Sequence, residues 1–394
     1  MSIAVIVDTF PRWSERFIAR ELNELKRRGA ALSIYCLKAG DAACNSDPEF
    51  SDLIQHRVVL PACFIPSAAR ELGVDAASMR RRALAEAELG LTAFRQIGCA
   101  NSLVKLLREQ QPSAVYAHFA SLPSTLGWLA AETLGLPLLI SAHARDVFVE
   151  AQVLSEKIRY AQKIFACNEK ACSFLEAAQM KTPVEGRIQF MRHGLPLEAF
   201  VFKARAIPAA DTPLKLLAAG RLVKKKGFGD LIEALALLPE IGAPILLTML
   251  GDGPERKSLE ARIAKLGLSA RIKLAGSVQG QALKTYFDAA DALVVPSIEM
   301  DDGDSEGVPN VLLEAFAVGL PVIGTQSGSA GEVLTVETGT VVPQRDPDAL
   351  AGALSDFASA PERAIEKTRV ARALVEARYD IRKNIEPLAR TLGL

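Results

Sequence analysis

The 394-residue sequence lacks most of the features that mark specialised classes of protein. Its 46 basic and 46 acidic side chains cancel, so it has no excess of positive charge for sequence-independent binding to nucleic-acid phosphates. Its six cysteines include no C-x-x-C pair, which argues against zinc ribbons and disulfide frameworks and fits thiols in a reducing cytosol. We therefore expect no nucleic-acid partner and a cytoplasmic location.

Long hydrophobic runs are also missing. The most apolar window, Gly127 to Ala142, contains Glu132 and Pro137, and no stretch reaches the roughly 18 uninterrupted apolar residues typical of a membrane span. We expect a soluble protein, with peripheral attachment at the cytoplasmic face of the inner membrane as the alternative. Arg80–Arg82 could contact an anionic membrane surface, although three consecutive arginines more often form a solvated helix face.

The sequence does contain a regular alternation of strand and helix patterns. Hydrophobic residues make up 49% of the chain, and its length suggests about two domains. Because parallel strands need crossover connections, usually helices, this alternation predicts an α/β fold with mostly parallel sheets. In the first half we expect a helix at Ser14–Arg28, a long helical region at Arg70–Glu109, and strands at Ile3–Asp8, Leu32–Leu37, Arg57–Leu60, Ala114–His118, Leu138–Ser141, Lys163–Cys167 and Ile188–Met191.

A break in composition at Phe202–Pro213 predicts the linker between two doubly wound domains. We place an N-terminal domain at 1–203, a C-terminal domain at 204–376, and a terminal helix at 377–394 that either caps the second domain or crosses back to the first. In the second domain we expect strands at Lys215–Ala219, Ile245–Leu250, Ile272–Ala275, Ala292–Pro296 and Pro321–Thr325, and helices at Gly229–Leu238, Glu255–Leu266, Ala282–Ala289 and Asn310–Val318.

The acidic loop 296–306 and the helix after it form the densest group of candidate residues. Pro309 stands where a first-turn proline would open a helix, with Glu306 just before it and Glu314 about two turns inside it. The amides of Gly307 to Asn310 at the helix N-terminus could receive an oxyanion, while carboxylates accept from hydroxyl groups. The pattern fits a polyhydroxylated ligand carrying a phosphate, and about equally well an ordinary helix with an acidic residue at its N-terminus.

A basic turn, GRLVKKKGFG, follows the first strand of the second domain. An arginine fork and a lysine point charge suit a diphosphate, whose negative charge grows as it leaves. We select Arg221 and Lys226, since the glycine after Lys226 would let the backbone approach a ligand, and expect two of the three lysines to be solvated. The turn LGDGP at 250–254 is only a weak nucleotide signal because it lacks the third glycine of G-x-G-x-x-G.

Two further patterns concern histidine and metal ions. His118, His143 and His193 each follow an apolar strand, which makes His118 and His143 candidates at a ligand-binding edge, with Asp146 one turn beyond His143. The triplet Asp302-Gly303-Asp304 resembles the metal-binding D-x-D of some sugar-nucleotide enzymes. Since Arg221 and Lys226 could neutralise a leaving diphosphate, we expect no metal and no cofactor.

With these residues in place, the chain resembles the retaining glycosyltransferases of family 4, which have the GT-B architecture of two Rossmann-like domains facing each other across a cleft. The similarity rests on GRLVKKKGF, on LGDGP and above all on the E-x7-E motif from Glu306 to Glu314. More loosely, FPRWSERFIARELNELKRRG resembles the opening of bacterial exopolysaccharide and colanic acid glycosyltransferases. The resemblance implies transfer of a sugar from a nucleotide diphosphate (NDP) sugar to a saccharide or lipid-linked acceptor in cell-surface polysaccharide or glycolipid biosynthesis.

The resemblance also implies roles for individual residues. Arg221 and Lys226 would bind the diphosphate, Glu306 the donor sugar hydroxyls and Glu314 the ribose, while His118 would stand near the transferring carbon. We expect His118, Glu306, Arg221 and Lys226 to act in catalysis. The remaining donor-side residues would be Gly251, Val278, Gly307, Val308, Pro309, Asn310, Val311 and Glu314, and the acceptor-side candidates are Ser14, Glu15, His143 and Asp146.

Two other functions use similar features. An NDP-sugar epimerase can share the architecture and the diphosphate site, but it needs acid and base groups on both faces of the sugar, and the first half offers no pair of carboxylates that demands this interpretation. A noncatalytic sugar-nucleotide sensor would bind the donor without turning it over. Donor isomerisation without acceptor, or binding without turnover, would favour these alternatives.

Overall fold

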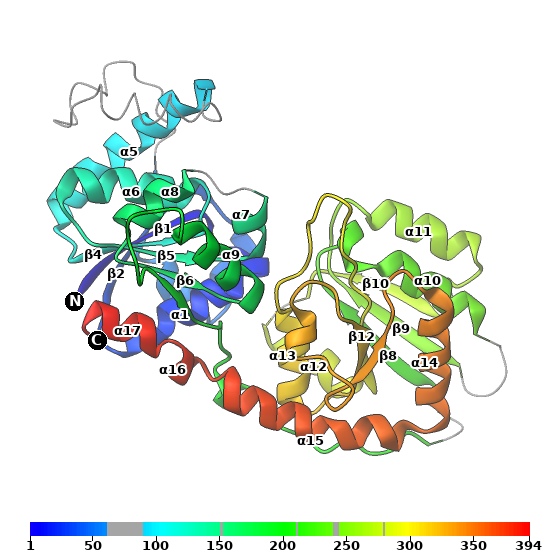
Figure 1. Ribbon diagram of the computed structural model, residues 1–394. Helices are drawn as coiled ribbons and strands as arrows, with labels where there is room; N and C mark the ends of the chain where they lie inside the picture. Colours follow the sequence, from blue (N-terminus) through cyan, green and yellow to red (C-terminus); the bar gives the residue numbers. More distant parts are fainter. Residues whose placement is uncertain (61–89, 150–152, 210–211, 239–243, 279) are drawn as a thin grey trace. The chain divides into compact units, whose positions relative to one another are not determined.

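The computed structural model describes residues 1–60, 90–149, 153–209, 212–238, 244–278 and 280–394, and the chain divides into two compact units (Figure 1). Unit 1 comprises Met1–Gly194 together with Ile381–Leu394, and unit 2 comprises Leu195–Asp380. The expected membrane contact of Arg80–Arg82 and residues 70–89 of the predicted helical region Arg70–Glu109 lie outside the described residues.

Unit 1 is built on a seven-stranded parallel sheet with strand order β3-β2-β1-β4-β5-β6-β7. All seven predicted strands are confirmed. Buried aliphatic side chains line both faces of the central strands, as parallel sheets covered by helices require. The strands are β1 (Ser2–Phe10), β2 (Ala31–Ala39), β3 (Arg57–Val59), β4 (Ala114–His118), β5 (Leu138–Ala142), β6 (Lys163–Ala166) and β7 (Ile188–Phe190).

Helices cover both faces of this sheet (Figure 1). One face packs against α5 (Gly90–Gln110), α6 (Leu122–Leu134), α8 (Leu154–Tyr160) and α9 (Glu169–Gln179). The other face packs against α1 (Arg16–Arg27) and the C-terminal α17 (Glu386–Leu392). Shorter elements are η1 (Trp13–Glu15), η2 (Ala42–Ser46), α2 (Ser51–Ile54), α7 (Ala144–Phe148) and α16 (Ile381–Asn384).

Unit 2 repeats the plan with a six-stranded parallel sheet in the order β10-β9-β8-β11-β12-β13. The five predicted strands are present, and β13 is an additional short edge strand. The strands are β8 (Leu214–Ala219), β9 (Ile245–Leu250), β10 (Ile272–Gly276), β11 (Ala292–Val295), β12 (Val322–Thr325) and β13 (Thr340–Val342).

The unit 2 helices form two layers around the sheet (Figure 1). On one face lie α10 (Phe228–Leu237), α11 (Arg256–Lys265) and α14 (Pro347–Ser359). On the other lie α12 (Gly280–Ala289) and α13 (Asn310–Val318), with α15 (Pro361–Arg378) packed against α13. Three single-turn elements, η3 (Leu197–Ala199), η4 (Lys224–Lys226) and η5 (Ala330–Glu332), complete the unit.

The division between the units lies earlier than the boundary placed between residues 203 and 204. The segment from Leu195 onward is bound to unit 2, since the Leu195 amide donates to the carbonyl of Tyr379 and the Arg205 guanidinium donates to the carbonyls of Gly319 and Phe287. The expected linker is therefore largely fastened to the second unit. At the other end, the division falls after Asp380 instead of after residue 376, and residues 381–394 belong to unit 1.

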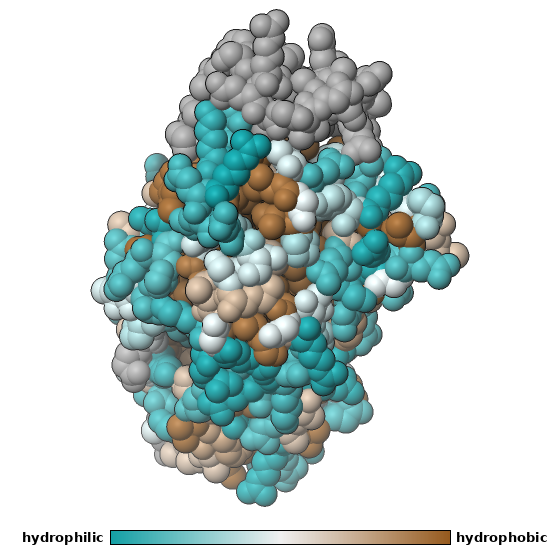
Figure 2. Space-filling view, turned by 90° about the vertical axis from the view of Figure 1, so that its left-hand side faces the viewer, coloured by the Kyte–Doolittle hydropathy of each residue, from teal (hydrophilic) through white to brown (hydrophobic). Residues whose placement is uncertain are grey.

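The surface carries hydrophobic and hydrophilic residues side by side on the face that Figure 2 shows. Exposed large apolar side chains include Phe148 and Phe174, whose rings make an edge-to-face contact in unit 1. Among the helices that the structure describes, none is both long enough and apolar enough to cross a membrane.

Candidate functional site

Each sheet has a point at which the strand order reverses. In unit 1 the reversal lies between β1 and β4, and in unit 2 between β8 and β11. In doubly wound sheets, ligands bind beyond the carboxyl ends of the strands at this point, because the neighbouring loops run to opposite faces and leave room between them. His118 is the last residue of β4, Arg221 follows β8 and Glu306 follows β11, so the sequence-predicted residues lie at both reversal points.

Glycines bring the loops of unit 2 close together. A side chain at Gly227, whose φ is +64°, would place its Cβ 1.8 Å from the carbonyl oxygen of Pro296. The turn η4 can therefore pack directly against the end of β11. The structure shows that Gly227 lets one loop approach another, and its predicted role in letting the backbone approach a ligand stays a prediction. This contact holds the lysines of η4 beside the acidic loop.

Lys226 and Glu306 form the centre of the unit 2 site. The Lys226 Nζ donates to Glu306 Oε2 at 2.8 Å, and the two side chains are only 15% and 12% exposed. Lys225 Nζ lies 3.6 Å from Glu306 Oε1 and also binds Asp304 Oδ1 at 2.9 Å. Only Lys224 of the three lysines is exposed, so the expectation of two solvated lysines was wrong.

The two ammonium groups also set the charge of Glu306. Burial by itself would raise the pKa of this carboxyl group, but the ion pairs with Lys226 and Lys225 outweigh burial and hold its pKa below the ordinary value. Glu306 is therefore ionised at neutral pH. It can accept hydrogen bonds from ligand hydroxyl groups while it holds the Lys226 ammonium in place.

Helix α13 begins immediately beyond this pair. Its bounds, Asn310–Val318, are those predicted, and Pro309 is the N-cap residue with extended backbone, one position before the first turn in which we expected a proline. The first amides of the helix have no intrahelical acceptor and can receive a ligand oxyanion. Glu314 is the fifth residue of α13, little more than one turn inside the helix instead of the predicted two, and its side chain is buried.

The other donor-side candidates line the same carboxyl edge of the sheet. Arg221 is exposed and forms no ion pair with the residues that the structure describes. Gly251 closes β9 so tightly that a Cβ atom would lie 1.8 Å from the carbonyl oxygen of Gly220. Val278 is half-buried after β10. Gly307, Val308, Asn310 and Val311 are also half-buried, between β11 and the first turn of α13.

The unit 1 site is a buried cluster around Glu21 of α1. Its carboxylate accepts from the Tyr116 hydroxyl at 2.9 Å and lies 2.5 Å from His193 Nδ1 and 3.9 Å from His118 Nε2. The imidazole of His143 stacks on that of His193, with ring centres 5.0 Å apart. Phe17 contacts the rings of both His143 and His193, and Phe119 contacts that of His143. Both ring nitrogens of His118 and of His143 are buried and have no hydrogen-bond partner among the described residues.

Burial determines the protonation of His118. The ring is fully buried, and both desolvation and the imidazoles of His143 and His193 lower its pKa against the opposing effect of Glu21. His118 is therefore neutral at physiological pH. A neutral imidazole can donate through one nitrogen and accept through the other, which suits contact with a hydroxyl group.

The loop after His118 is held in an unusual conformation. Phe119 has a φ of +75°, a strained value for a residue with a large side chain. The Asp146 carboxylate accepts from the Ala120 amide at 2.5 Å, and the buried Lys157 ammonium donates to the carbonyl oxygens of Ala120 and Ser121. Asp146 also accepts from the His143 amide, whereas its carboxylate lies 3.8 Å from His143 Nδ1. Asp146 thus fixes the loops that carry both histidines.

The remaining acceptor-side candidates, Ser14 and Glu15, lie outside the imidazole cluster. Ser14 is exposed on η1, and Glu15 pairs with Arg12 at 2.8 Å. The structure gives neither residue a contact with the imidazole cluster.

The D-x-D triplet forms a turn in which Asp302 accepts from the Asp304 amide and Asp304 binds Lys225. Within the described part of the chain, no three His, Cys, Asp or Glu side chains are grouped so as to hold a metal ion.

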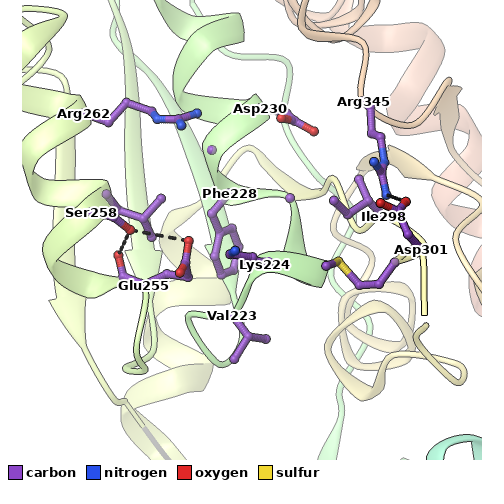
Figure 3. Close-up of a pocket in the computed structure, with 14 residues that line it drawn as sticks. Val223, Lys224, Phe228, Asp230, Glu255, Ser258, Arg262, Ile298, Asp301 and Arg345 are labelled. Atoms are coloured by element: carbon purple, nitrogen blue, oxygen red, sulfur yellow. Dashed lines mark hydrogen bonds and ion pairs between the residues drawn. The ribbon is translucent and has the colours of Figure 1, made fainter. Parts of the chain in front are cut away.

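A separate pocket of about 350 Å³ lies beside η4 in unit 2 (Figure 3). Its walls come from η4, α10, α11, the loop after β11 and Arg345, with Phe228 and Lys224 between them. Arg221, Lys226 and Glu306 do not line it. Its cations Lys224, Arg262 and Arg345 are balanced by Asp230, Glu255 and Asp301, so charge alone does not select a ligand for this pocket.

Two important residues of the unit 1 cluster, Glu21 and His193, were not among the functional residues that we predicted. Glu21 lies four residues after Phe17 on the buried stripe of α1 and is 1% exposed. A carboxylate at a core position of an amphipathic helix is a signal that could have identified it. His193 was noted after a strand, but nothing in the sequence around it indicates that Glu21 is its partner.

The sequence is similar to those of known glycosyltransferases. Residues 202–372 match the family described as Glycosyl transferases group 1. Amylovoran biosynthesis glycosyltransferase AmsK of Erwinia amylovora is 32% identical over 243 residues, which cover 60% of this chain and 59% of that protein. Putative colanic acid biosynthesis glycosyltransferase WcaL of Escherichia coli is 36% identical over 157 residues, covering 40% of this chain and 39% of that protein. The matched regions span less than two thirds of the length of these relatives.

Solved structures resemble the chain over nearly its whole length. Anabaena Alr3699/HepE, in complex with UDP and glucose, has a TM-score of 0.75 at 18% identity and covers 100% of this chain and 99% of its own. WaaG, a glycosyltransferase involved in lipopolysaccharide biosynthesis, has a TM-score of 0.65 at 19% identity and covers 99% and 98%. At these identities the likeness shows the fold, and it confirms the predicted GT-B class with two doubly wound Rossmann-like domains. Since the family match spans almost all of unit 2, residues 202–372 of this chain are a Glycosyl transferases group 1 domain.

Proposed function

We propose that the protein is a retaining glycosyltransferase that moves a sugar from an NDP-sugar to an acceptor hydroxyl group in cell-surface polysaccharide or glycolipid biosynthesis. The observation that carries this proposal is the Lys226–Glu306 pair beside the N-terminus of α13, within the segment that matches the group 1 glycosyl transferases. The names of AmsK and WcaL support the biosynthetic context. The HepE structure in complex with UDP and glucose supports the class of donor.

The unit 2 site suits a sugar diphosphate because it combines N–H donors for the phosphate oxygens with a carboxylate that accepts from the sugar hydroxyls. The Lys226 ammonium uses one N–H on Glu306, which leaves two for phosphate oxygens. Arg221 offers a planar guanidinium that is not engaged with the described residues, and α13 offers its first amides. Glu306 accepts from the sugar hydroxyls. Together, Arg221, Lys225 and Lys226 outnumber Glu306 and Asp304 by one positive charge, which favours an anionic ligand.

In the transfer step, the bond between the anomeric carbon and the diphosphate oxygen breaks and a bond to the acceptor oxygen forms on the same face. The acceptor proton passes to the departing diphosphate oxygen, so the products are the glycoside and the protonated NDP. Arg221 and Lys226 stabilise the diphosphate most as its charge grows, which lowers the barrier selectively. In this proposal no metal ion takes part and the NDP-sugar is a substrate, not a cofactor.

The proposed acceptor is a saccharide or lipid-linked saccharide, handled by His118 and its neighbours in unit 1. Neutral His118 can contact the hydroxyl that attacks. Peripheral association with the cytoplasmic face of the inner membrane belongs to this proposal, because a lipid-linked acceptor would be presented there.

A donor screen followed by turnover tests the proposal. Thermal unfolding should be measured with UDP-, GDP-, ADP- and TDP-sugars, because a ligand selective for the folded state raises its apparent stability. The stabilising donor should then yield NDP only when an acceptor is supplied, and the anomeric configuration of the glycoside should be read by NMR. Stabilisation by no donor, isomerisation of the donor without acceptor, or an inverted product would each contradict the proposal.

A further inference from the structure

The cluster in unit 1 contains an ion pair to which none of the preceding functions assigns a role. Glu21 of α1 and His193, just after β7, are 172 residues apart in sequence, and their side chains meet at 2.5 Å between Oε1 and Nδ1. Glu21 is 1% exposed. A carboxylate buried to this degree is stable only when it is paired and hydrogen-bonded, and here His193 and the Tyr116 hydroxyl supply both kinds of contact.

The positions of the protons follow from these contacts. Burial would raise the pKa of Glu21, but His193 outweighs it, and with His118 and the Tyr116 hydroxyl it lowers the pKa, so the carboxylate is ionised. Burial and the Glu21 charge raise the pKa of the Tyr116 hydroxyl, so this hydroxyl donates to Glu21 and does not accept. The Nδ1 atom of His193 must therefore carry a proton as well, because an ionised carboxylate can only accept.

The second nitrogen of His193, Nε2, belongs to a ring that stacks on the imidazole of His143. Nε2 is buried and has no hydrogen-bond partner among the described residues. The nearby Cys167 thiol raises the pKa of His193 in the same direction as Glu21, although it makes no hydrogen bond of normal geometry with Nε2. Burial opposes these effects, and Glu21 outweighs burial. The titratable groups around His193 are Glu21, Tyr116, His118, His143 and Cys167.

We propose that Glu21 is a positioning residue that keeps His193 protonated, so that His193 presents a charged Nε2–H donor to a substrate oxygen beside His118 and His143. The role deepens the proposed function and rests on it, since the oxygen would belong to the sugar acceptor. His193 donates, whereas neutral His118 remains able to accept from the attacking hydroxyl. The buried carboxylate thus gives the two imidazoles different roles: His193 always donates, and His118 can donate or accept.

The test replaces Glu21 by glutamine, which keeps the shape and the hydrogen-bonding oxygen but removes the charge. In the wild type, the ¹³C and ¹⁵N NMR signals of His193 should show the protonated ring throughout pH 6–9. In Glu21→Gln they should show neutral imidazole at pH 8.5 and titrate at lower pH. The kcat for transfer should fall by at least about tenfold at pH 8.5, and the loss should shrink as the pH falls to 6, since one pKa unit changes protonation tenfold.

Two further variants separate positioning from structure. Glu24→Gln lies one turn along the same helix and disturbs a carboxylate that binds Arg27 and Arg28, so its pH profile should match the wild type. His193→Gln should lose activity at every pH without recovery, and its spectrum identifies the His193 signals. NDP affinity, measured by calorimetry, should be unchanged in Glu21→Gln because the unit 2 residues are intact.

Either of two results would overturn the inference: a wild-type His193 that is neutral at pH 8, or a Glu21→Gln deficit that is the same at every pH. The NMR titration needs no turnover, so it decides the state of the pair even if the proposed transferase activity fails. An active enzyme with a neutral His193 would leave the proposed function standing and remove only this inference.

Discussion

Replacing Lys226 by alanine tests the proposed donor site most directly. The change removes a 2.8 Å charge-assisted hydrogen bond to Glu306 but leaves Lys225 3.6 Å from the same carboxylate. A hydrogen bond to a charged group contributes about 1.5–3 kcal/mol, and partial exposure with a remaining cation reduces the expected loss of unfolding free energy to about 1–2 kcal/mol. Because domains are typically stable by about 5–15 kcal/mol, the variant should remain folded.

The loss of activity should exceed what this loss of stability explains. Lys226 would meet the diphosphate as its charge grows, so kcat/KM should fall at least about tenfold, or ~1.4 kcal/mol of transition-state stabilisation. Steady-state transfer with the cognate donor and acceptor gives this number, calorimetry gives the NDP affinity, and urea unfolding gives the stability. The pKa of Glu306 should rise in the variant, since Lys226 is the main group that lowers it.

Lys224→Ala provides the matched control. Lys224 belongs to the same turn, is exposed, and makes no ion pair with the described residues. It should therefore retain activity within about twofold, because surface substitutions of this kind change little. If Lys226→Ala transferred sugar at the wild-type rate while Lys224→Ala did not, the assignment of the diphosphate site would be refuted.

Four other outcomes follow from the structure. Glu306→Ala should lower kcat/KM at least about tenfold while the protein stays folded by circular dichroism, and a wild-type rate would remove Glu306 from the site. His118→Ala should keep NDP affinity but impair transfer, and calorimetry showing lost affinity would contradict this. Gly227→Ala should lower the thermal midpoint, because its Cβ would meet a carbonyl oxygen at 1.8 Å, and an unchanged midpoint would refute the packing argument. The pKa of His193 is raised in the folded protein, so its contribution to stability is complete below the ordinary histidine pKa of 6.5 and is lost as the pH rises. The difference in urea stability between wild type and His193→Gln should therefore shrink from pH 6.5 to 10. A difference that stays constant over this range would count against the ion pair.

Local pattern was sufficient for most of the secondary structure. Each of the twelve predicted strands matches a strand of the structure, because continuous aliphatic runs bounded by turn residues are the signature of parallel strands buried on both faces. The exceptions are informative. The edge strand β13 is three residues long and pairs with β12, so its short sequence carries too little periodicity to be recognised.

The unit 2 site could be predicted in part because its residues are grouped in two short segments. A basic turn after β8 and an acidic loop after β11 are each visible in the sequence. The reason for the glycine beside Lys226 was not visible, because Pro296 lies 69 residues from Gly227 and approaches it only when β8 and β11 pair. The burial of Glu314 was not visible for a similar reason, since it depends on elements packed around α13.

The sequence by itself determined which segments become strands and helices, and which residue types stand at the ends of strands. Those properties depend on residues within a few positions in the sequence, so the period of the hydrophobic residues and the placement of glycines predict them. Only the tertiary structure decided that Lys226 pairs with Glu306 across 80 residues and that Glu21 pairs with His193 across 172. The physical reason is that the order of strands in each sheet decides which distant residues meet. Burial then removes water from their charged groups, which are stable only when they pair with each other.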